Sequence, residues 1–168
     1  MALLFQYGSN MSPARLNSAN RLRGDAKSLG LAQTADQYEL DFTVWSTGNR
    51  CAATDLVPNG SRRIWGVLYQ VPDELLARET SGARKSMDEI EGRMYQRHPI
   101  VVCREGSSCS PLTAWTYTVI NKVQGLKTSF AYARHLLCGL REHSAPAEYM
   151  EYVKGRILSN NPKLQGRL

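Results

Sequence analysis

Residues 38–45, YELDFTVW, alternate between apolar and polar side chains. A period of two residues is typical of a strand that buries one face. Residues 51–57, CAATDLV, follow a Thr-Gly-Asn turn and form a second predicted strand. The sequence PNGS at residues 58–61 is a hairpin turn signal between this strand and the next one along the chain.

Further strand signals lie on both sides of this region. Residues 3–7 form a short apolar run, and residues 64–71, IWGVLYQV, are rich in β-branched and aromatic side chains. Residues 94–103 and 112–120 have the same character and are joined by a loop that contains Gly and Ser. We therefore expect these last two strands to form a hairpin.

Helix signals are fewer and fall near the start, in the middle and at the end of the chain. Pro13 follows a serine and suits the first turn of a short helix. Residues 72–80, PDELLARET, begin with a proline and two acids, which is typical of a helix start. Ser86 and Glu89 have the spacing of a capping box, so another short helix is predicted there. The last two predicted helices are residues 129–143 and 145–158.

These signals together predict an α+β fold, with a mostly antiparallel sheet or small mixed barrel flanked by helices. Residues 1–158 are predicted to form one domain. Residues 159–168, SNNPKLQGRL, form a polar C-terminal tail that is expected to fray.

Composition is consistent with one domain that has a buried core, because the chain has 168 residues and 42% of them are hydrophobic. No apolar run approaches the roughly 18 residues that would span a membrane. The first residues lack the charged n-region of a signal peptide. We therefore expect a cytoplasmic protein with no membrane association.

The formal net charge of +6 permits affinity for nucleic acid or for small anions. The basic residues, Arg15 and Arg21 among them, are scattered and form no dense run or nucleic-acid-binding module. We interpret them as a solvated basic surface, which would also suit an anionic small substrate. A nucleic-acid partner is not expected; steeply salt-dependent binding to an oligonucleotide would be evidence for one.

The four cysteines, at positions 51, 103, 109 and 138, show no C-x-x-C spacing. We expect them to be reduced and mostly buried. His135 and Cys138 are three residues apart on a predicted helix, but two ligands do not make a zinc site. No metal site is predicted.

The sequence Tyr7-Gly8-Ser9-Asn10 lies between the first strand and the first helix. Such a turn points backbone N–H groups toward one place, which favours a carboxylate or an oxyanion. Gly8 would let a ligand approach the backbone closely. The alternative is an ordinary turn, because Gly, Ser and Asn are common turn residues.

A second candidate is Glu91, which falls in an apolar row with Met87, Ile90 and Met94 on the helix that begins at Ser86. A carboxylate on a buried face has a raised pKa, as a general acid/base at neutral pH requires. The alternative is a charge at a frayed helix end, because the next residue is a glycine. The chain contains no Gly-x-Ser-x-Gly motif, P-loop or dinucleotide-binding fingerprint.

The chain resembles the γ-glutamylcyclotransferase-like family in an ordered set of short sequences that covers nearly its whole length. YGSN follows the first strand, and the later sequences match in order. The last of them resembles the helical C-terminal region of γ-glutamylcyclotransferase. The later sequences are YELDF (38–42), IWGVLYQV (64–71), MDEIEG (87–92), TYTV (116–119) and YARHLLCGLREHSAPAEYMEYV (132–153).

The resemblance implies a small mixed β-barrel flanked by helices, an enzyme without a cofactor, and the release of 5-oxoproline from a γ-glutamyl compound. In this reaction the substrate α-amine attacks its own γ-carbonyl group and expels an amine. The implied catalytic residue is Glu91. The implied substrate-binding residues are Leu4, Phe5, Gln6, Tyr7, Gly8, Ser9, Asn10, Tyr95, Tyr117 and Tyr132.

Two positions depart from the family pattern. Gln6 stands where small or aromatic residues are common, and Asn10 stands where the glutathione-specific branch usually has Leu. The sequence therefore does not identify the leaving group. A homodimer is a possible assembly. A binding module that holds a γ-glutamyl compound or another acidic metabolite without turnover is the main alternative to an enzyme.

Overall fold

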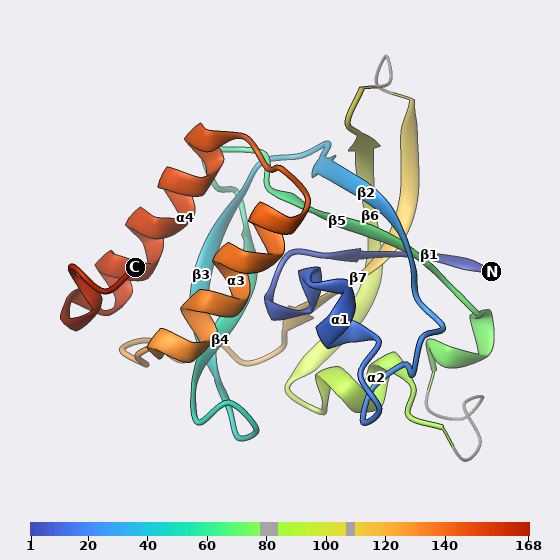
Figure 1. Cartoon of the computed structure of the whole chain (residues 1–168), viewed down its shortest axis with the longest axis horizontal. Coiled ribbons are helices and arrows are strands. Elements are labelled where there is room, and N and C mark those ends of the chain that lie inside the picture. Colours follow the sequence, from blue (N-terminus) through green and yellow to red (C-terminus); the bar gives the residue numbers. More distant parts are fainter. Residues whose placement is uncertain (78–83, 107–109) are drawn as a thin grey trace.

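The computed structural model describes residues 1–77, 84–106 and 110–168, and its centre is a closed barrel (Figure 1). Adjacent strands are antiparallel except β1 and β7, which are parallel and close the barrel through the pair Leu4 and Trp115. This confirms the predicted α+β class with a small mixed barrel. In barrel order the strands are β1 (Ala2–Gln6), β5 (Trp65–Val71), β2 (Lys27–Thr34), β6 (Tyr95–Arg104) and β7 (Pro111–Val119).

Strand β2 was not predicted from the sequence, although it pairs with both β5 and β6. Its sequence, KSLGLAQT, has one β-branched residue and no regular alternation. Gly30 has a positive φ of 93° next to a shift in register between Ser28 and Gly30. The strand is therefore formed by its two neighbours rather than by its own residue preferences.

Strands β3 (Tyr38–Ser46) and β4 (Cys51–Pro58) form a separate two-stranded sheet. The alternating pattern correctly predicted β3, but the hairpin expected at residues 58–61 is wrong. After β4 the chain turns through Asn59, whose φ is 62°, and the next strand joins the barrel. The turn signal at residues 58–61 therefore lies where the chain passes from the two-stranded sheet to the barrel.

The helices lie near the start, in the middle and at the end of the chain, as predicted. Ser86 and Glu89 form the expected capping box, whereas the Ser12 side chain makes no capping hydrogen bond. Of the helix expected over residues 72–80, the structure has only a 3-10 turn, and residues 78–80 lie outside the described residues. The helices are α1 (Pro13–Leu16), α2 (Met87–Glu91), α3 (Phe130–Glu142) and α4 (Ala147–Asn160), and the 3-10 turns are η1 (Ser9–Met11), η2 (Asp73–Leu75) and η4 (Pro162–Leu164).

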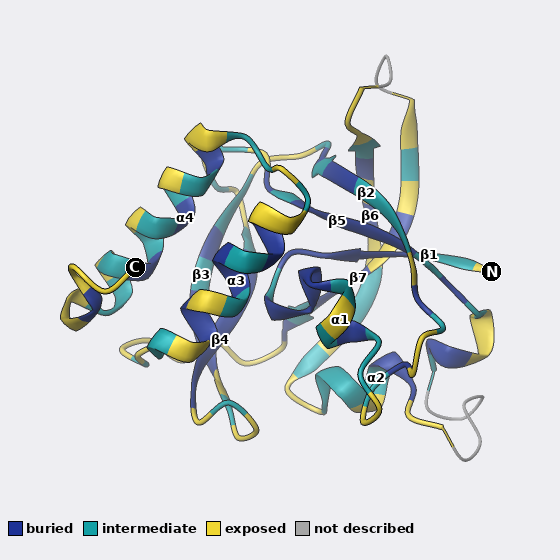
Figure 2. Cartoon of the chain, viewed as in Figure 1, coloured by how far each residue is buried: buried dark blue, intermediate teal, exposed yellow. Residues whose placement is uncertain are grey.

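Helix α3 packs against η1, the short turn that follows the first strand. Gly139 of α3 makes this approach possible, because a Cβ atom there would lie 2.8 Å from Cβ of Met11. The inward side of α3 is buried and its outward side is exposed (Figure 2). The helix therefore holds the segment that contains the predicted ligand-binding turn.

The C-terminal segment is packed rather than frayed. Leu164 in η4 is 3% exposed, and Asn161 donates a hydrogen bond to the Thr128 carbonyl (2.7 Å). The Arg167 guanidinium lies over the Phe130 ring, 4.7 Å from its centre. These contacts tie residues 159–168 to the start of α3, so the expectation of a frayed tail is wrong.

The prediction of reduced cysteines is wrong for Cys103, near the end of β6, which is disulfide-bonded. Cys51 and Cys138 are free thiols, and position 109 lies outside the described residues. The sequence spacing gave no indication of the bond, because it contains no motif that distinguishes this cysteine from the others.

Candidate functional site

The residues that the sequence singled out converge on an inner cavity of about 30 Å³. It adjoins an outer cavity of about 740 Å³, and the two share Ser9, Asn10, Glu91, Tyr95 and Tyr132. Residues from distant parts of the chain therefore form one site. The inner cavity is lined by Gln6, Tyr7, Gly8, Ser9, Asn10, Thr54, Glu91, Tyr95, Tyr117 and Tyr132.

Hydrogen bonds from two tyrosines hold the turn after β1 in place. The Tyr69 hydroxyl of β5 donates to the Met11 carbonyl (2.6 Å), and the Tyr7 hydroxyl donates to the Tyr117 carbonyl (2.6 Å). A Cβ atom at Gly8 would lie 2.6 Å from Oγ1 of Thr54, so the close approach of β4 requires glycine there. The turn is thus fixed before any ligand binds.

The amide N–H groups at the start of this turn are unpaired in the described residues. In residues 1–77, 84–106 and 110–168, those of Gly8, Ser9 and Asn10 form no hydrogen bond with another residue. All three residues line the inner cavity. Such a set of unpaired donors suits a carboxylate or a developing oxyanion.

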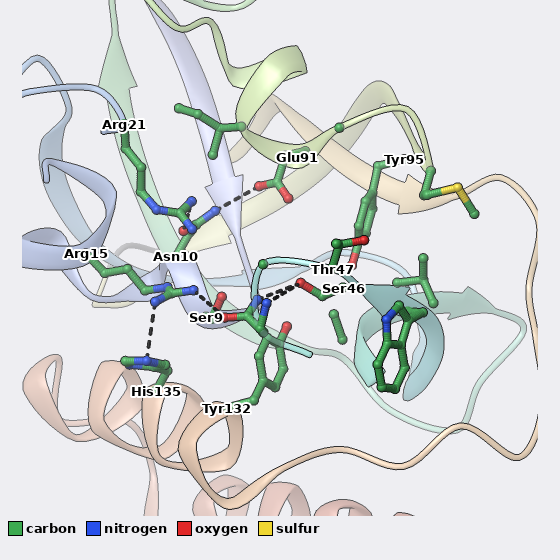
Figure 3. Close-up of a pocket in the computed structure, with 18 of the residues that line it drawn as sticks. Ser9, Asn10, Arg15, Arg21, Ser46, Thr47, Glu91, Tyr95, Tyr132 and His135 are labelled. Atoms are coloured by element: carbon green, nitrogen blue, oxygen red, sulfur yellow. Dashed lines mark hydrogen bonds between the residues drawn. The ribbon is translucent and has the colours of Figure 1, made fainter. Parts of the chain in front are cut away.

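Glu91 is the last residue of α2, and its carboxylate faces the turn (Figure 3). Its Oε1 atom accepts hydrogen bonds from Nδ2 of Asn10 (3.0 Å) and from Nε2 of Gln6 (3.2 Å). Asn10 is oriented in turn by Arg21, whose Nη1 donates to Oδ1 of Asn10 (2.8 Å). Because the amide oxygen is occupied by Arg21, the amide NH₂ group must point toward Glu91.

Burial raises the pKa of Glu91 above its ordinary value. The hydrogen bond from Asn10, the charge of Arg21, the hydrogen bond from Gln6 and the charge of Arg15 act in the opposite direction without cancelling the rise. Within the described part of the chain, Glu91 is the only carboxylate that lines either cavity. A raised pKa brings a carboxyl group closer to the range in which it can exchange protons at neutral pH.

The expected apolar row on α2 is correct for Met87 and Ile90 but wrong for Met94. Met87 is fully buried, whereas Met94 is 45% exposed. The helix ends at Glu91, and Gly92 follows with a positive φ of 82°, so the chain leaves the helical spacing before Met94. The apolar row is therefore correct for Met87 and Ile90, which lie on the same short helix as Glu91.

The predicted tyrosines line the inner cavity and are anchored to the protein. The Tyr95 hydroxyl donates to the Thr54 carbonyl (2.8 Å), and the Tyr117 hydroxyl donates to Oδ1 of Asp88 (2.8 Å). The Tyr132 hydroxyl accepts a hydrogen bond from the Thr54 amide (3.0 Å). Burial is the main cause of the raised pKa of each of these tyrosines, so they stay protonated and form a rigid wall.

Leu4 and Phe5 lie elsewhere than predicted. Both side chains are fully buried in the core, and neither lines the inner or the outer cavity. They belong to β1, which pairs with β5 and β7 in the barrel. The two side chains therefore belong to the core, and binding of a substrate by this part of the chain stays a prediction.

Several site residues were missed. Thr54 lies in the middle of a strand, where nothing in the local pattern marks it. Arg15 and Arg21 line the outer cavity, so the interpretation as solvated surface is wrong for these two. Arg15 donates to Oδ1 of Asn49 (3.0 Å) and lies 3.3 Å from Nε2 of His135 (Figure 3). Only the fold brings them together.

In the described residues, no three or more His, Cys, Asp or Glu side chains come close enough to hold a metal ion. No helix of the described residues is both long and apolar enough to cross a bilayer.

Comparison with known proteins supports one family. A family model described as "Gamma-glutamyl cyclotransferase, AIG2-like" matches residues 4–135. A solved structure named "Gamma-glutamyl cyclotransferase" aligns with a TM-score of 0.76 and 21% identity over 91% of this chain and 86% of that chain. No curated protein sequence matches the chain significantly.

Two further solved structures share the fold. An uncharacterized protein from Homo sapiens aligns with a TM-score of 0.75 and 22% identity, over 91% of this chain and 86% of that chain. YkqA from Bacillus subtilis aligns with a TM-score of 0.74 and 21% identity, over 95% of this chain and 55% of that chain.

Proposed function

Because the chain belongs to the gamma-glutamyl cyclotransferase, AIG2-like family, we propose that it releases 5-oxoproline from a γ-glutamyl amino acid or amine. The observation that carries the proposal is Glu91. It is the one carboxylate lining the two cavities in the described residues, its pKa is raised, and two amides hold it beside the turn after β1.

Glu91 acts first as a base. The neutral α-amine of the substrate attacks the γ-carbonyl carbon to close a five-membered ring, and Glu91 takes a proton from this nitrogen as the new bond forms. The reacting groups belong to one molecule, so the site mainly has to hold a folded conformer. The free amides of Gly8, Ser9 and Asn10 receive the negative oxygen that forms on the γ-carbon. One such donor is typically worth about 3 kcal/mol.

Glu91 then acts as an acid. It returns a proton to the departing nitrogen while the original bond between that nitrogen and the γ-carbon breaks. The products are 5-oxoproline and a free amine, and one proton has moved from the attacking nitrogen to the leaving nitrogen. The chain's own side chains supply every proton transfer in this scheme.

A substrate panel tests the proposal. Wild-type protein is incubated with a γ-glutamyl dipeptide, glutathione and γ-glutamyl-lysine, and 5-oxoproline is quantified by mass spectrometry. Each substrate is matched with its N-acetylated form, which has no free α-amine. We expect 5-oxoproline from at least one free substrate and none from the acetylated forms.

Two results would count against the proposal. Free glutamate in place of 5-oxoproline would indicate hydrolysis by water rather than ring closure. Tight binding of 5-oxoproline or of a panel member, without turnover of any, would favour the non-catalytic binding module. The preferred substrate would identify the leaving group.

A further inference from the structure

The positive charges that line the outer cavity outnumber the negative charges beside them. Arg15, Arg21 and Arg93 line it, whereas Glu91 is the one carboxylate on its wall in the described residues. None of the three arginines forms an ion pair with a described carboxylate. The cavity therefore holds an excess of two positive charges when Glu91 is ionised.

This lack of partners contrasts with cations elsewhere in the fold. Lys122 pairs with the buried Asp55, Arg97 with Asp88, and Arg156 with Glu39 and Asp41. Partly buried cations in this protein are thus usually matched by a carboxylate. Arg15 and Arg21 are partly buried and are the exceptions, and an unbalanced charge in a cavity is expected to have a ligand.

Arg15 is held by neutral groups and has a donor to spare. Its terminal nitrogens contact Asn49 and His135, and its buried Nε atom has no hydrogen-bond partner. Burial and the charge of Arg15 lower the pKa of His135, so the ring is neutral at pH 7 and accepts the hydrogen bond. The guanidinium is therefore fixed in place without being neutralised.

The two arginines from the N-terminal segment have different partners (Figure 3). Arg21 reaches the reacting carboxylate through Asn10, and it lowers the pKa of Glu91 more than Arg15 does. Arg15 is joined instead to Asn49 and His135, on the opposite side from α2. Arg21 is thus the nearer partner for the α-carboxylate of a γ-glutamyl group.

The Arg21 guanidinium would balance the charge of that α-carboxylate. One excess positive charge would then remain beside the rest of the substrate. The inner cavity of about 30 Å³ admits only a few atoms. The leaving part must therefore lie in the outer cavity, beside Arg15 and Arg93. We propose that the leaving group is anionic, carrying a carboxylate or a phosphate, and that Arg15 is the residue that selects it. This inference rests on the proposed cyclisation.

Three substrates test it: γ-glutamyl-alanine, its neutral amide γ-glutamyl-alaninamide, and γ-glutamyl-O-phosphoserine. We expect wild-type kcat/KM to be about tenfold or more higher for γ-glutamyl-alanine than for the amide, as for a hydrogen bond to a charged group. The Arg15→Met variant should lose most of this preference, and Arg15→Lys should keep part of it. The phosphoserine substrate carries a phosphate in addition to the carboxylate, so it shows whether more negative charge on the leaving group raises kcat/KM further.

Arg134→Met is the matched control. Arg134 is exposed on α3 beside His135 and does not line the cavity, so its loss removes the same charge without touching the subsite. Its substrate preference should equal that of wild type. Equal losses for the acid and the amide in Arg15→Met would overturn the inference, because Arg15 would then serve the glutamyl part or the fold.

The proposed function and this inference fail differently. If no substrate releases 5-oxoproline, the proposed cyclisation is wrong. The affinities of the same three compounds, measured by calorimetry, then test whether the cavity prefers an anionic group. Tighter binding of the anionic compounds that Arg15→Met removes would keep an anion subsite. Equal binding of the acid and the amide, or no binding of either, would overturn it.

Discussion

At the scale of single residues, Asn10 is the centre of the site. It receives a hydrogen bond from Arg21 and gives one to Glu91, so one amide couples a cation to the Glu91 carboxylate. After burial, which raises the pKa of Glu91, the Asn10 hydrogen bond is the strongest influence, and it acts to lower that pKa. The operating pH of the site should therefore depend on this residue.

We predict that Asn10→Ala moves the acid limb of the kcat/KM profile to higher pH. Glu91 must be ionised to act as a base, and losing a donor to the carboxylate raises its pKa further. Loss of a hydrogen bond to a charged group corresponds to a shift of about one pH unit. The profile is measured from pH 4 to 9, with the exposed Asn121→Ala as control. A shift to lower pH would contradict this description of the site.

Local patterns made Glu91 and the turn after β1 candidates, and the family resemblance selected them over a frayed helix end and an ordinary turn. A capping box placed α2, and an apolar row placed the carboxylate on its inward face. Arg21 and Thr54 could not be found this way, since both reach the site only through long-range packing. Arg21 lies in an irregular segment, and Thr54 lies within a strand that is buried along most of its length.

At the scale of elements, α3 packs closely against the turn that follows β1. Gly139 allows the helix to meet η1, whereas Gly155 in the middle of α4 has no atom within 4 Å of a potential Cβ position. The two glycines occupy interior helical positions in different surroundings. They form a matched pair for testing the contact.

We predict opposite effects of alanine at these positions. Gly155→Ala should stabilise the protein by roughly 0.5–1 kcal/mol, because alanine favours the helix. Gly139→Ala should instead destabilise it by about 1–3 kcal/mol, because the new Cβ atom overpacks the contact with Met11. Urea denaturation measures both free energies of unfolding. Equal stabilisation by the two substitutions would show that α3 does not press on η1.

The elements that sequence predicted well are those with strong internal patterns, such as β3 and α3. Strand β2 was missed because its glycine and weak β propensity are compensated by two neighbouring strands. The turn signal at residues 58–61 identified a turn but not its partner strands. Pairing across the chain, including the parallel closure of β1 on β7, is not contained in local spacing.

At the scale of the whole molecule, Asp55 joins the β3–β4 sheet to the barrel. Its fully buried carboxylate accepts hydrogen bonds from the Val119 amide (2.9 Å) and the Thr43 hydroxyl (2.9 Å) and pairs with Lys122. The next residue towards the N-terminus, Thr54, lines the inner cavity. The interaction between the two sheets thus also positions one wall of the site.

We predict that Asp55→Ala lowers the free energy of unfolding by about 3 kcal/mol or more, because it leaves buried donors and a cation without their acceptor. The exposed Asp36→Ala, which removes an equal charge, should change stability by less than about 0.5 kcal/mol. Thermal or urea denaturation compares the two variants. Similar stabilities would show that the two sheets are held together mainly by apolar packing.

The central claim is that Glu91 transfers the protons of a cyclisation reaction. The most direct measurement is the rate of 5-oxoproline release by wild type and by Glu91→Gln, on whichever γ-glutamyl substrate the wild type prefers. Gln keeps the shape of the side chain but cannot take the proton, so we expect a loss of about 100-fold or more. An unchanged rate in a folded Glu91→Gln protein would contradict the account.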